Sequence, residues 1–355
     1  MKKYELTQNS IKIDNRTLYQ IKALKDFGSV KKGDLGGYIE SEKNLNHDGN
    51  CWVSGNAQVY GNAQVYGNAL VSGDAEVSGK ARVFGNTYIF DNARVYGDAQ
   101  VFENTRVFGN VRVFGDAQVY GDAHIYGDAE VSGDVEVSGN AQVYENAQVY
   151  GNAQVYENAQ VYGKAEVYGN AHVYGDVRVY ENARVYGDAQ VYRNARVSEN
   201  AWVFGNASVS GNAHVYGNAQ VSGNVSVYGN AQVYGNVQVF GDARVFENAR
   251  VYGSARVYKY ALVSGNAWVY GNARVYENAQ IYDNAWVCGN THIFENAHVY
   301  GDAHLGNVPI DFDCNFDPYK TLKEILNCPE IFSVLSGLNK NLDKLISTIL
   351  TKTST

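Results

Sequence analysis

The chain has 355 residues and a formal net charge of −8 at pH 7. Its N-terminal sequence, MKKYELTQNS, has two lysines but no apolar run, so it does not predict a signal peptide, and no later segment predicts a membrane-spanning helix. The negative charge and the lack of a continuous basic stripe argue against direct binding of nucleic acid. We therefore expect a cytoplasmic protein without membrane contact.

Residues 1–52 do not repeat and are expected to form an N-terminal cap. Short apolar alternations lie on both sides of Asn15, which predicts a small antiparallel element with a turn at this residue. Ile39 and Leu45 are six residues apart, whereas Leu45 and Val53 are eight apart. We therefore expect an irregular first coil, with a bulge of two residues, between the cap and the repeat that follows.

A repeat of six residues occupies 53–305. From Val53 to Leu305 a Val, Ile or Leu recurs at every sixth position, which gives 42 consecutive hexads. Within one hexad, Ala and Val point to one side of a short strand, Gln and Tyr point to the other, and Gly and Asn suit a corner. Since one hexad cannot bury its valine, the bends must wind the chain into a solenoid of stacked parallel coils.

The hexad pattern resembles that of a known superfamily. A small residue (Ala, Ser, Thr or Val), two positions later Val, Ile or Leu, and then Gly with Asn or Asp is similar to the hexapeptide-repeat superfamily of left-handed parallel β-helices. The resemblance implies an all-β fold with three hexads per coil, so that 42 hexads make about 14 triangular coils. Periodicity alone also permits two or four hexads per coil.

The same resemblance suggests a first functional hypothesis. Enzymes of this superfamily are trimeric acyltransferases that use a histidine as general base and an acyl-CoA as donor. The segments LYQIKALKDF and KKGDLGGYIESEKNL resemble the N-terminal region of uncharacterised bacterial and phage hexapeptide proteins, which have no assigned reaction.

The histidines and cysteines do not predict a catalytic or metal site. Each histidine of the repeat occupies the ordinary outward position before the valine, and His292, His298 and His304 are expected on three different faces. The four cysteines lack a CxxC spacing, which favours free thiols. We therefore expect no catalytic residues, no cofactor and no metal.

Charge is segregated within the hexad. The two corner positions of the 42 hexads hold 20 carboxylates, whereas the position before the valine holds 11 arginines and 4 glutamates. One interpretation is a solubilising surface. The alternative is an inhibitor of phage origin. Its carboxylates would imitate the phosphates of nucleic acid and occupy a basic groove made for phosphates. The candidate acidic ridge consists of Asp98, Asp116, Asp122, Asp128 and Asp134.

Aromatic residues follow the valine in most hexads. With three hexads per coil, six rings are expected to stack in one column, and such a ladder also keeps a sheet flat. The alternative is a sticky face that binds a partner, a sugar polymer or another subunit. The column consists of Phe90, Phe108, Tyr126, Tyr144, Tyr162 and Tyr180.

Apolar residues also occur at both ends of one expected face, in the position before the valine. They predict docking strips for the chain's own terminal segments or for another subunit. These candidate interaction residues are Trp52, Leu70 and Tyr88 near the beginning of the repeat, and Trp268, Trp286 and His304 near its end.

Residues 306–355 are expected to form a helical segment. Pro318 and Pro329 can each begin a helix, and an amphipathic helix with Leu342, Ile346 and Ile349 on its apolar face is predicted to follow. A solenoid needs a cap on its last coil, and the alternative role is oligomerisation or binding of a partner.

These observations favour a non-enzymatic scaffold or binding protein. We expect it to act through protein contacts on its faces or terminal helices, with self-association as a dimer or trimer. The acyltransferase and the acidic nucleic-acid mimic are the alternative hypotheses, and binding of a carbohydrate stays open.

Overall fold

The computed structural model describes residues 2–306, 309–310 and 315–316. Contacts between Cα atoms divide the chain into two compact units, Met1–Gly217 and Asn218–Thr355.

The first unit begins with an antiparallel cap. β1 (Tyr4–Ile13) and β2 (Arg16–Ala23) pair antiparallel on either side of a turn at residues 14–15, as the sequence predicts. β2 pairs antiparallel with β3 (Leu35–Ile39), and β3 then pairs in parallel with β5 (Gln58–Val59). A 3-10 helix, η1 (Glu42–Asn44), follows β3. β3 therefore joins the cap to the repeat.

Strands of the repeat pair in parallel with a constant offset of 18 residues. Val59 pairs with Val77, for example, and Val143 with Val161. Because a hexad has six residues, three strands make one coil, and two or four hexads per coil are excluded. Ile39 pairs with Val59, an offset of 20. The first coil thus contains the two extra residues that the sequence predicts.

The strands of the repeat in this unit form three stacks, called faces 1, 2 and 3 below. Face 1 consists of β4 (Trp52–Val53), β7 (Leu70–Val71), β10 (Tyr88–Ile89), β13 (Arg106–Val107), β16 (His124–Ile125), β19 (Gln142–Val143), β22 (Gln160–Val161), β25 (Arg178–Val179), β28 (Arg196–Val197) and β31 (His214–Gly217). Face 2 consists of β5, β8 (Glu76–Val77), β11 (Arg94–Val95), β14 (Arg112–Phe114), β17 (Glu130–Gly133), β20 (Gln148–Gly151), β23 (Glu166–Val167), β26 (Arg184–Val185) and β29 (Trp202–Phe204). Face 3 consists of β6 (Gln64–Val65), β9 (Arg82–Val83), β12 (Gln100–Val101), β15 (Gln118–Val119), β18 (Glu136–Val137), β21 (Gln154–Tyr156), β24 (His172–Gly175), β27 (Gln190–Arg193) and β30 (Ser208–Val209).

The core of the coils is built from the two inward residues of each hexad. From Val53 to Val215 these residues are at most 1% exposed. A buried valine contributes about 1.5–3 kcal/mol, which cannot offset the entropy of ordering one coil, so stability comes from stacking. Where Thr87 replaces the small alanine, its hydroxyl donates to the carbonyl oxygen of Phe84 at 2.6 Å, so no inward polar group is left unpaired there.

The corners require a left-handed backbone. Gly79 has φ of 69°, and a Cβ added to it would lie 2.8 Å from the backbone nitrogen of Gly97 in the next coil. This close approach explains why glycine dominates the position. Seven charged residues nevertheless occupy it in the first unit with φ between 58° and 64°: Asp91, Glu103, Glu145, Glu157, Glu181, Arg193 and Glu199.

The second unit continues the same construction in three stacks of its own. One contains β32 (Gln220–Ser222), β35 (Gln238–Val239), β38 (Arg256–Val257), β41 (Arg274–Val275), β44 (His292–Ile293) and β47 (Pro309–Ile310). Another contains β33 (Ser226–Val227), β36 (Arg244–Val245), β39 (Leu262–Val263), β42 (Gln280–Ile281), β45 (His298–Val299) and β48 (Asn315–Phe316). The third contains β34 (Gln232–Gly235), β37 (Arg250–Val251), β40 (Trp268–Val269), β43 (Trp286–Cys288) and β46 (His304–Gly306).

Two strands follow the point where the hexads end. β47 pairs in parallel with β44, and β48 with β45, so the stacks extend past Leu305. His292 pairs with Pro309, an offset of 17, and this shorter coil is why the hexad register does not reveal these strands. The predicted helices, with Leu342, Ile346 and Ile349, lie outside the described residues.

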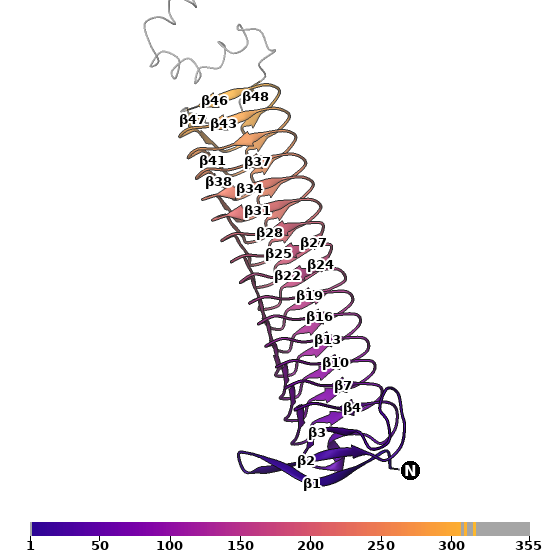
Figure 1. The fold of residues 1–355 in the computed structure, drawn as a ribbon. Coiled ribbons are helices and arrows are strands. Elements are labelled where there is room, and N and C mark those ends of the chain that lie inside the picture. Colours follow the sequence, from indigo (N-terminus) through magenta and orange to yellow (C-terminus); the bar gives the residue numbers. More distant parts are fainter. Residues whose placement is uncertain (1, 307–308, 311–314, 317–355) are drawn as a thin grey trace, which may run out of the picture. The chain divides into compact units, whose positions relative to one another are not determined.

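The described elements confirm the expected fold class. Apart from η1, all of them are strands, and the coils form a parallel β-helix. In Figure 1 the hairpin of the cap lies below the first coils, at the indigo end, and the strands of each face follow one above another. Within the described part of the chain, no helix has the length and apolar character that a membrane crossing needs.

Candidate interaction surfaces

Aromatic ladders cover much of the outer surface of the coils. In the predicted column of face 1, consecutive ring centroids from Phe90 to Tyr180 lie 4.8 to 5.1 Å apart, with interplanar angles of 2° to 6°. The spacing follows from the parallel strands, and the predicted stacking is confirmed. Burial in the ladder raises the pKa of Tyr144 to about 12.

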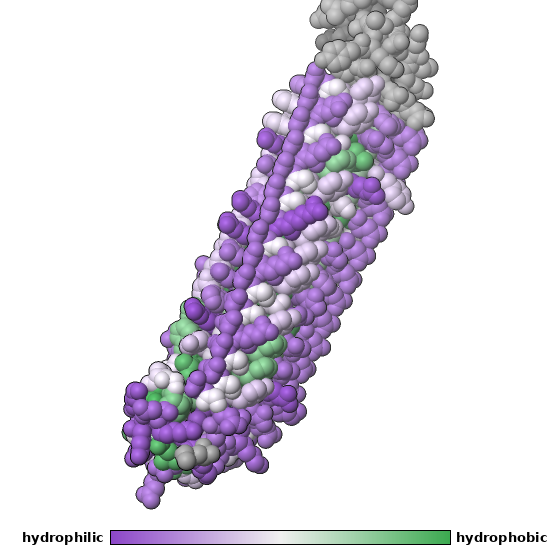
Figure 2. Space-filling model, turned by 90° about the vertical axis from the view of Figure 1, so that its right-hand side faces the viewer, coloured by the Kyte–Doolittle hydropathy of each residue, from purple (hydrophilic) through white to green (hydrophobic). Residues whose placement is uncertain are grey.

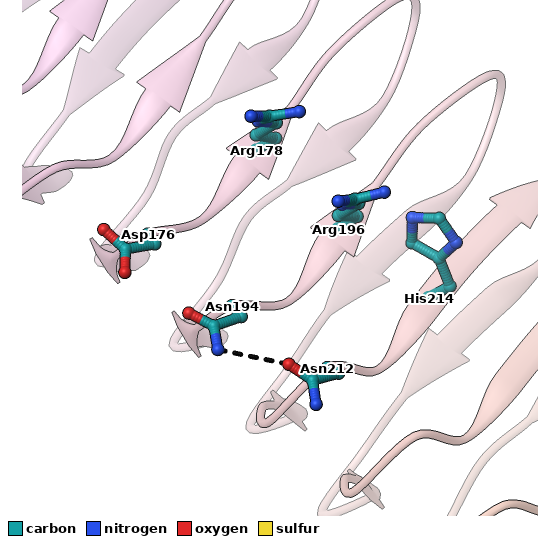
Figure 3. Close-up of a pocket in the computed structure, with 6 residues that line it drawn as sticks. All are labelled: Asp176, Arg178, Asn194, Arg196, Asn212 and His214. Carbon is teal, nitrogen blue, oxygen red and sulfur yellow. Dashed lines mark hydrogen bonds between the residues drawn. The ribbon is translucent and has the colours of Figure 1, made fainter.

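Amide ladders follow the corners. The side chain of Asn140 donates to Asn158 at 3.0 Å, and Asn158 donates to Asp176 at 2.8 Å. A carboxylate accepts but cannot donate, so this ladder ends at Asp176, and a new one begins where Asn194 donates to Asn212 at 3.1 Å (Figure 3). Figure 2 shows one corner as a narrow hydrophilic ridge beside the paler rows of a face.

The structure separates the five carboxylates of the candidate acidic ridge. Asp98, Asp116 and Asp134 are spaced by one coil and lie on the corner between faces 2 and 3. Asp122 accepts a hydrogen bond from Asn104, and Asp128 accepts one from the amide ladder of another corner. One ridge of five does not exist, because each hexad advances the chain by one corner.

The ridge that remains has a distinctive chemistry. Lys80 lies 3.4 Å from Asp98. Asp116 and Asp134, both exposed, accept no hydrogen bond and form no ion pair among the described residues. This part of the corner is therefore a pair of stacked carboxylates without a local counterion, where other corners have amide ladders.

Carboxylates in the glycine position have a structural role that their charge alone does not predict. Glu103 accepts a hydrogen bond from the backbone nitrogen of Gly121 at 2.8 Å, and Asp91 accepts one from that of Gly109 at 3.3 Å. Each thus binds the corner of the next coil, which offsets the cost of a positive φ at a residue with a Cβ. The signal in the sequence was Glu or Asp at a position that otherwise holds Gly.

The position before the valine differs in charge between the faces. On face 2, arginines pair with glutamates of neighbouring strands: Arg184 lies 3.3 Å from Glu166, and Arg112 pairs with Glu130. On face 1 no glutamate occupies this position. Face 2 is therefore locally neutralised and face 1 is not.

A groove on face 1 contains two of the three arginines of this face. It has a volume of about 480 Å³ and is lined by Asp176, Arg178, Asn194, Arg196, Asn212 and His214 (Figure 3). Arg178 and Arg196 are exposed, lie on adjacent paired strands, and form no ion pair among the described residues. Burial lowers the pKa of His214, and the charge of Arg196 lowers it further. The groove thus has two stacked guanidinium groups beside the imidazole of His214, with the carboxylate of Asp176 at its corner.

The three tryptophans predicted as interaction residues lie in two different environments. Trp52 is 5% exposed, and its ring lies edge-on to Phe27 of the cap, with centroids 5.4 Å apart. In the second unit the rings of Trp268 and Trp286 stack at 4.7 Å, and Trp286 stacks on His304 at 4.5 Å. Leu70 and Tyr88 follow Trp52 on face 1.

The histidines of the second unit do not converge. His292, His298 and His304 lie on β44, β45 and β46, one in each of its three stacks. Among the described residues, no group of three or more His, Cys, Asp or Glu side chains could hold a metal ion. Cys51 is buried and Cys288 is half-buried, and both are free thiols.

The fold and its repeated surfaces define the chain as a β-solenoid repeat protein. The family model for Bactofilin, described as polymer-forming cytoskeletal, matches residues 105–208. The model for the YdcK β-solenoid repeat matches residues 57–73, 63–79 and 219–235. No curated protein matches the chain. The two matches support a β-solenoid repeat family and do not single out the hexapeptide-repeat superfamily.

Proposed function

We propose that the chain is a non-enzymatic scaffold that acts through protein contacts, including contacts with other copies of itself. The observation that carries this proposal is the similarity of residues 105–208 to a family described as polymer-forming cytoskeletal. The matched segment lies within the coils of the first unit, where the ladders and charged columns repeat along every face.

The repetition supports such a role for a physical reason. Each coil presents the same kinds of side chain as the coil before it, displaced by about 4.8 Å along the stack. A partner with a matching period can contact several coils at once, and many weak contacts then add to a stable association. A scaffold therefore needs no single deep pocket.

Sedimentation velocity and electron microscopy of the purified full chain test the proposal. We expect species larger than a monomer whose size grows with protein concentration. A closed dimer or trimer gives one sedimenting species, whereas an open-ended assembly gives a distribution. A monomer at every concentration would rule out self-association.

A thermal-shift series with several acyl-CoA donors tests the enzymatic alternative in the same preparation. The acyltransferase hypothesis requires that a donor raises the melting temperature. The scaffold proposal expects no shift with any of them.

A further inference from the structure

We infer that a second copy of the chain binds to face 1 of the first unit, with its Asp116 and Asp134 against Arg178 and Arg196 of the first copy. The inference rests on the proposed self-association and specifies one surface through which it occurs. It is carried by three observations: two unpaired cations, two unpaired anions, and one shared spacing.

The cationic side of the contact is the groove of face 1. Arg178 pairs in register with Arg196, so the two side chains are neighbours on adjacent strands at a spacing of about 4.8 Å. Like charges at this separation repel one another. On face 2 glutamates relieve such repulsion, as in the 3.3 Å pair of Arg184 with Glu166, but face 1 supplies no glutamate in this column.

The anionic side of the contact is the corner between faces 2 and 3. Asp116 and Asp134 are also one coil apart and exposed. Lys80 reaches only Asp98, at 3.4 Å, and no amide of this corner donates to Asp116 or Asp134 in the described part of the chain. These two carboxylates therefore have the same need for a counterion as the two arginines.

The shared spacing makes the two sites complementary. Each pair is separated by one coil of the same fold, so a second copy aligned along the first can place both carboxylates against both guanidinium groups together. Arginine is suited to this role because its planar fork binds a carboxylate through two hydrogen bonds. A corner ridge also fits an open groove, which on face 1 has a volume of about 480 Å³.

The positions of the two sites decide what kind of assembly results. In a three-sided coil, the corner between faces 2 and 3 lies opposite face 1. One copy therefore offers its arginines to one neighbour and its aspartates to another. Such a heterologous contact does not close on itself, so the copies add side by side in an open-ended array.

Charge reversal in the full chain tests the contact, and the chain itself shows which substitutions its fold accepts. Glu76 and Glu166 occupy the same position of the hexad as Arg178 and Arg196. Lys80 and Lys164 occupy the same position of the hexad as Asp116 and Asp134. One variant carries R178E and R196E, and the other carries D116K and D134K. Each variant by itself should not assemble laterally at low salt, as measured by light scattering and sedimentation.

Mixing the two variants should restore the assembly. The reversed groove of the first variant then meets the lysines of the second, and the unchanged groove of the second meets the aspartates of the first. Wild-type assembly should also weaken as ionic strength rises, because the contact is between charges. The control variant, D122K with D128K, makes the same change in net charge on the other two corners and should assemble like the wild type.

A milder variant protects the test against misfolding. D116N with D134N introduces the residue that most corners contain, and it should lose assembly while its melting temperature is kept or raised. If the wild type assembles, and the charge-reversed and amide variants assemble equally well, the inferred contact is wrong and the scaffold proposal stands. If the wild type is monomeric at low salt, both this contact and the proposed self-association are wrong.

Discussion

The cap and the coils of the first unit are stabilised in opposite ways. In the cap each contact occurs once. Lys3 is 1% exposed, and its ammonium donates to the carbonyl oxygen of Cys51 at 2.8 Å. The hydroxyl of Tyr4 donates to the carbonyl oxygen of Leu45 at 2.7 Å. In the coils each contact recurs with every turn, as between the rings of Tyr126 and Tyr144. A residue of the cap is therefore hard to replace, whereas a residue of the coils is one of many.

The largest difference should appear between a tryptophan that packs against the cap and one that lies only among the coils. Trp52→Ala deletes a ring that is 5% exposed and packed against the cap, and we expect it to reduce the free energy of unfolding by about 3–5 kcal/mol. Trp202→Ala, a matched change at a half-buried position of face 2, should cost about 1 kcal/mol. Urea unfolding measures both, and equal losses would contradict the contrast between cap and coils.

Within the coils, equivalent positions should give equal effects. Val143 and Val161 are fully buried neighbours on face 1, and replacing either by Ala should cost about 2 kcal/mol. The two losses should agree within about 0.5 kcal/mol, because each valine has nearly the same surroundings. A large difference between the two variants would show that the coils are not interchangeable.

Alkaline pH should weaken the coils through their tyrosines. Burial raises the pKa of Tyr144 to about 12, and it does the same for Tyr150. An unfolded tyrosine ionises near pH 10, so the folded state holds its proton more tightly. The contribution to stability is complete below pH 10 and is lost as the pH rises toward 12. Melting temperatures between pH 8 and 12 measure the decline, which Tyr144→Phe should reduce.

The smallest effect should come from the charged corners. Glu103→Ala keeps the strained φ of 63° but removes the hydrogen bond to Gly121, so we expect a loss of about 1 kcal/mol. Glu103→Gly removes the bond and the strain together and should lie within about 0.5 kcal/mol of the wild type. The order of the two variants in thermal unfolding is the measurement. An alanine variant as stable as the wild type would show that the hydrogen bond does not stabilise the fold.

The same contrast explains which features the sequence could predict. The hexad register of Val, Gly and Asn predicts strands, corners and core, because every turn repeats the same physical requirement. The ladder from Phe90 to Tyr180 follows once the coil is assigned three hexads. Lys3 could not be assigned to the interior, since a lysine in a polar N-terminal sequence has no pattern that indicates burial.

The candidate surfaces were partly visible and partly hidden. The carboxylates were visible, but their grouping depends on the 18-residue offset, which separates Asp122 and Asp128 from Asp98, Asp116 and Asp134. The unpaired state of Arg178 and Arg196 depends on which face holds the glutamates. Sequence spacing alone does not show which charged side chains form ion pairs.

The three-sided coil also constrains how such a chain can change in length. An inserted or deleted hexad leaves the alternation of inward and outward residues intact, yet it rotates all that follows by one third of a turn. Arg196 and the rest of its column would then move to another face while the core stayed packed. Only changes of 18 residues keep the angular phase, so a surface pattern can persist through gain or loss of whole coils but is scrambled by anything smaller.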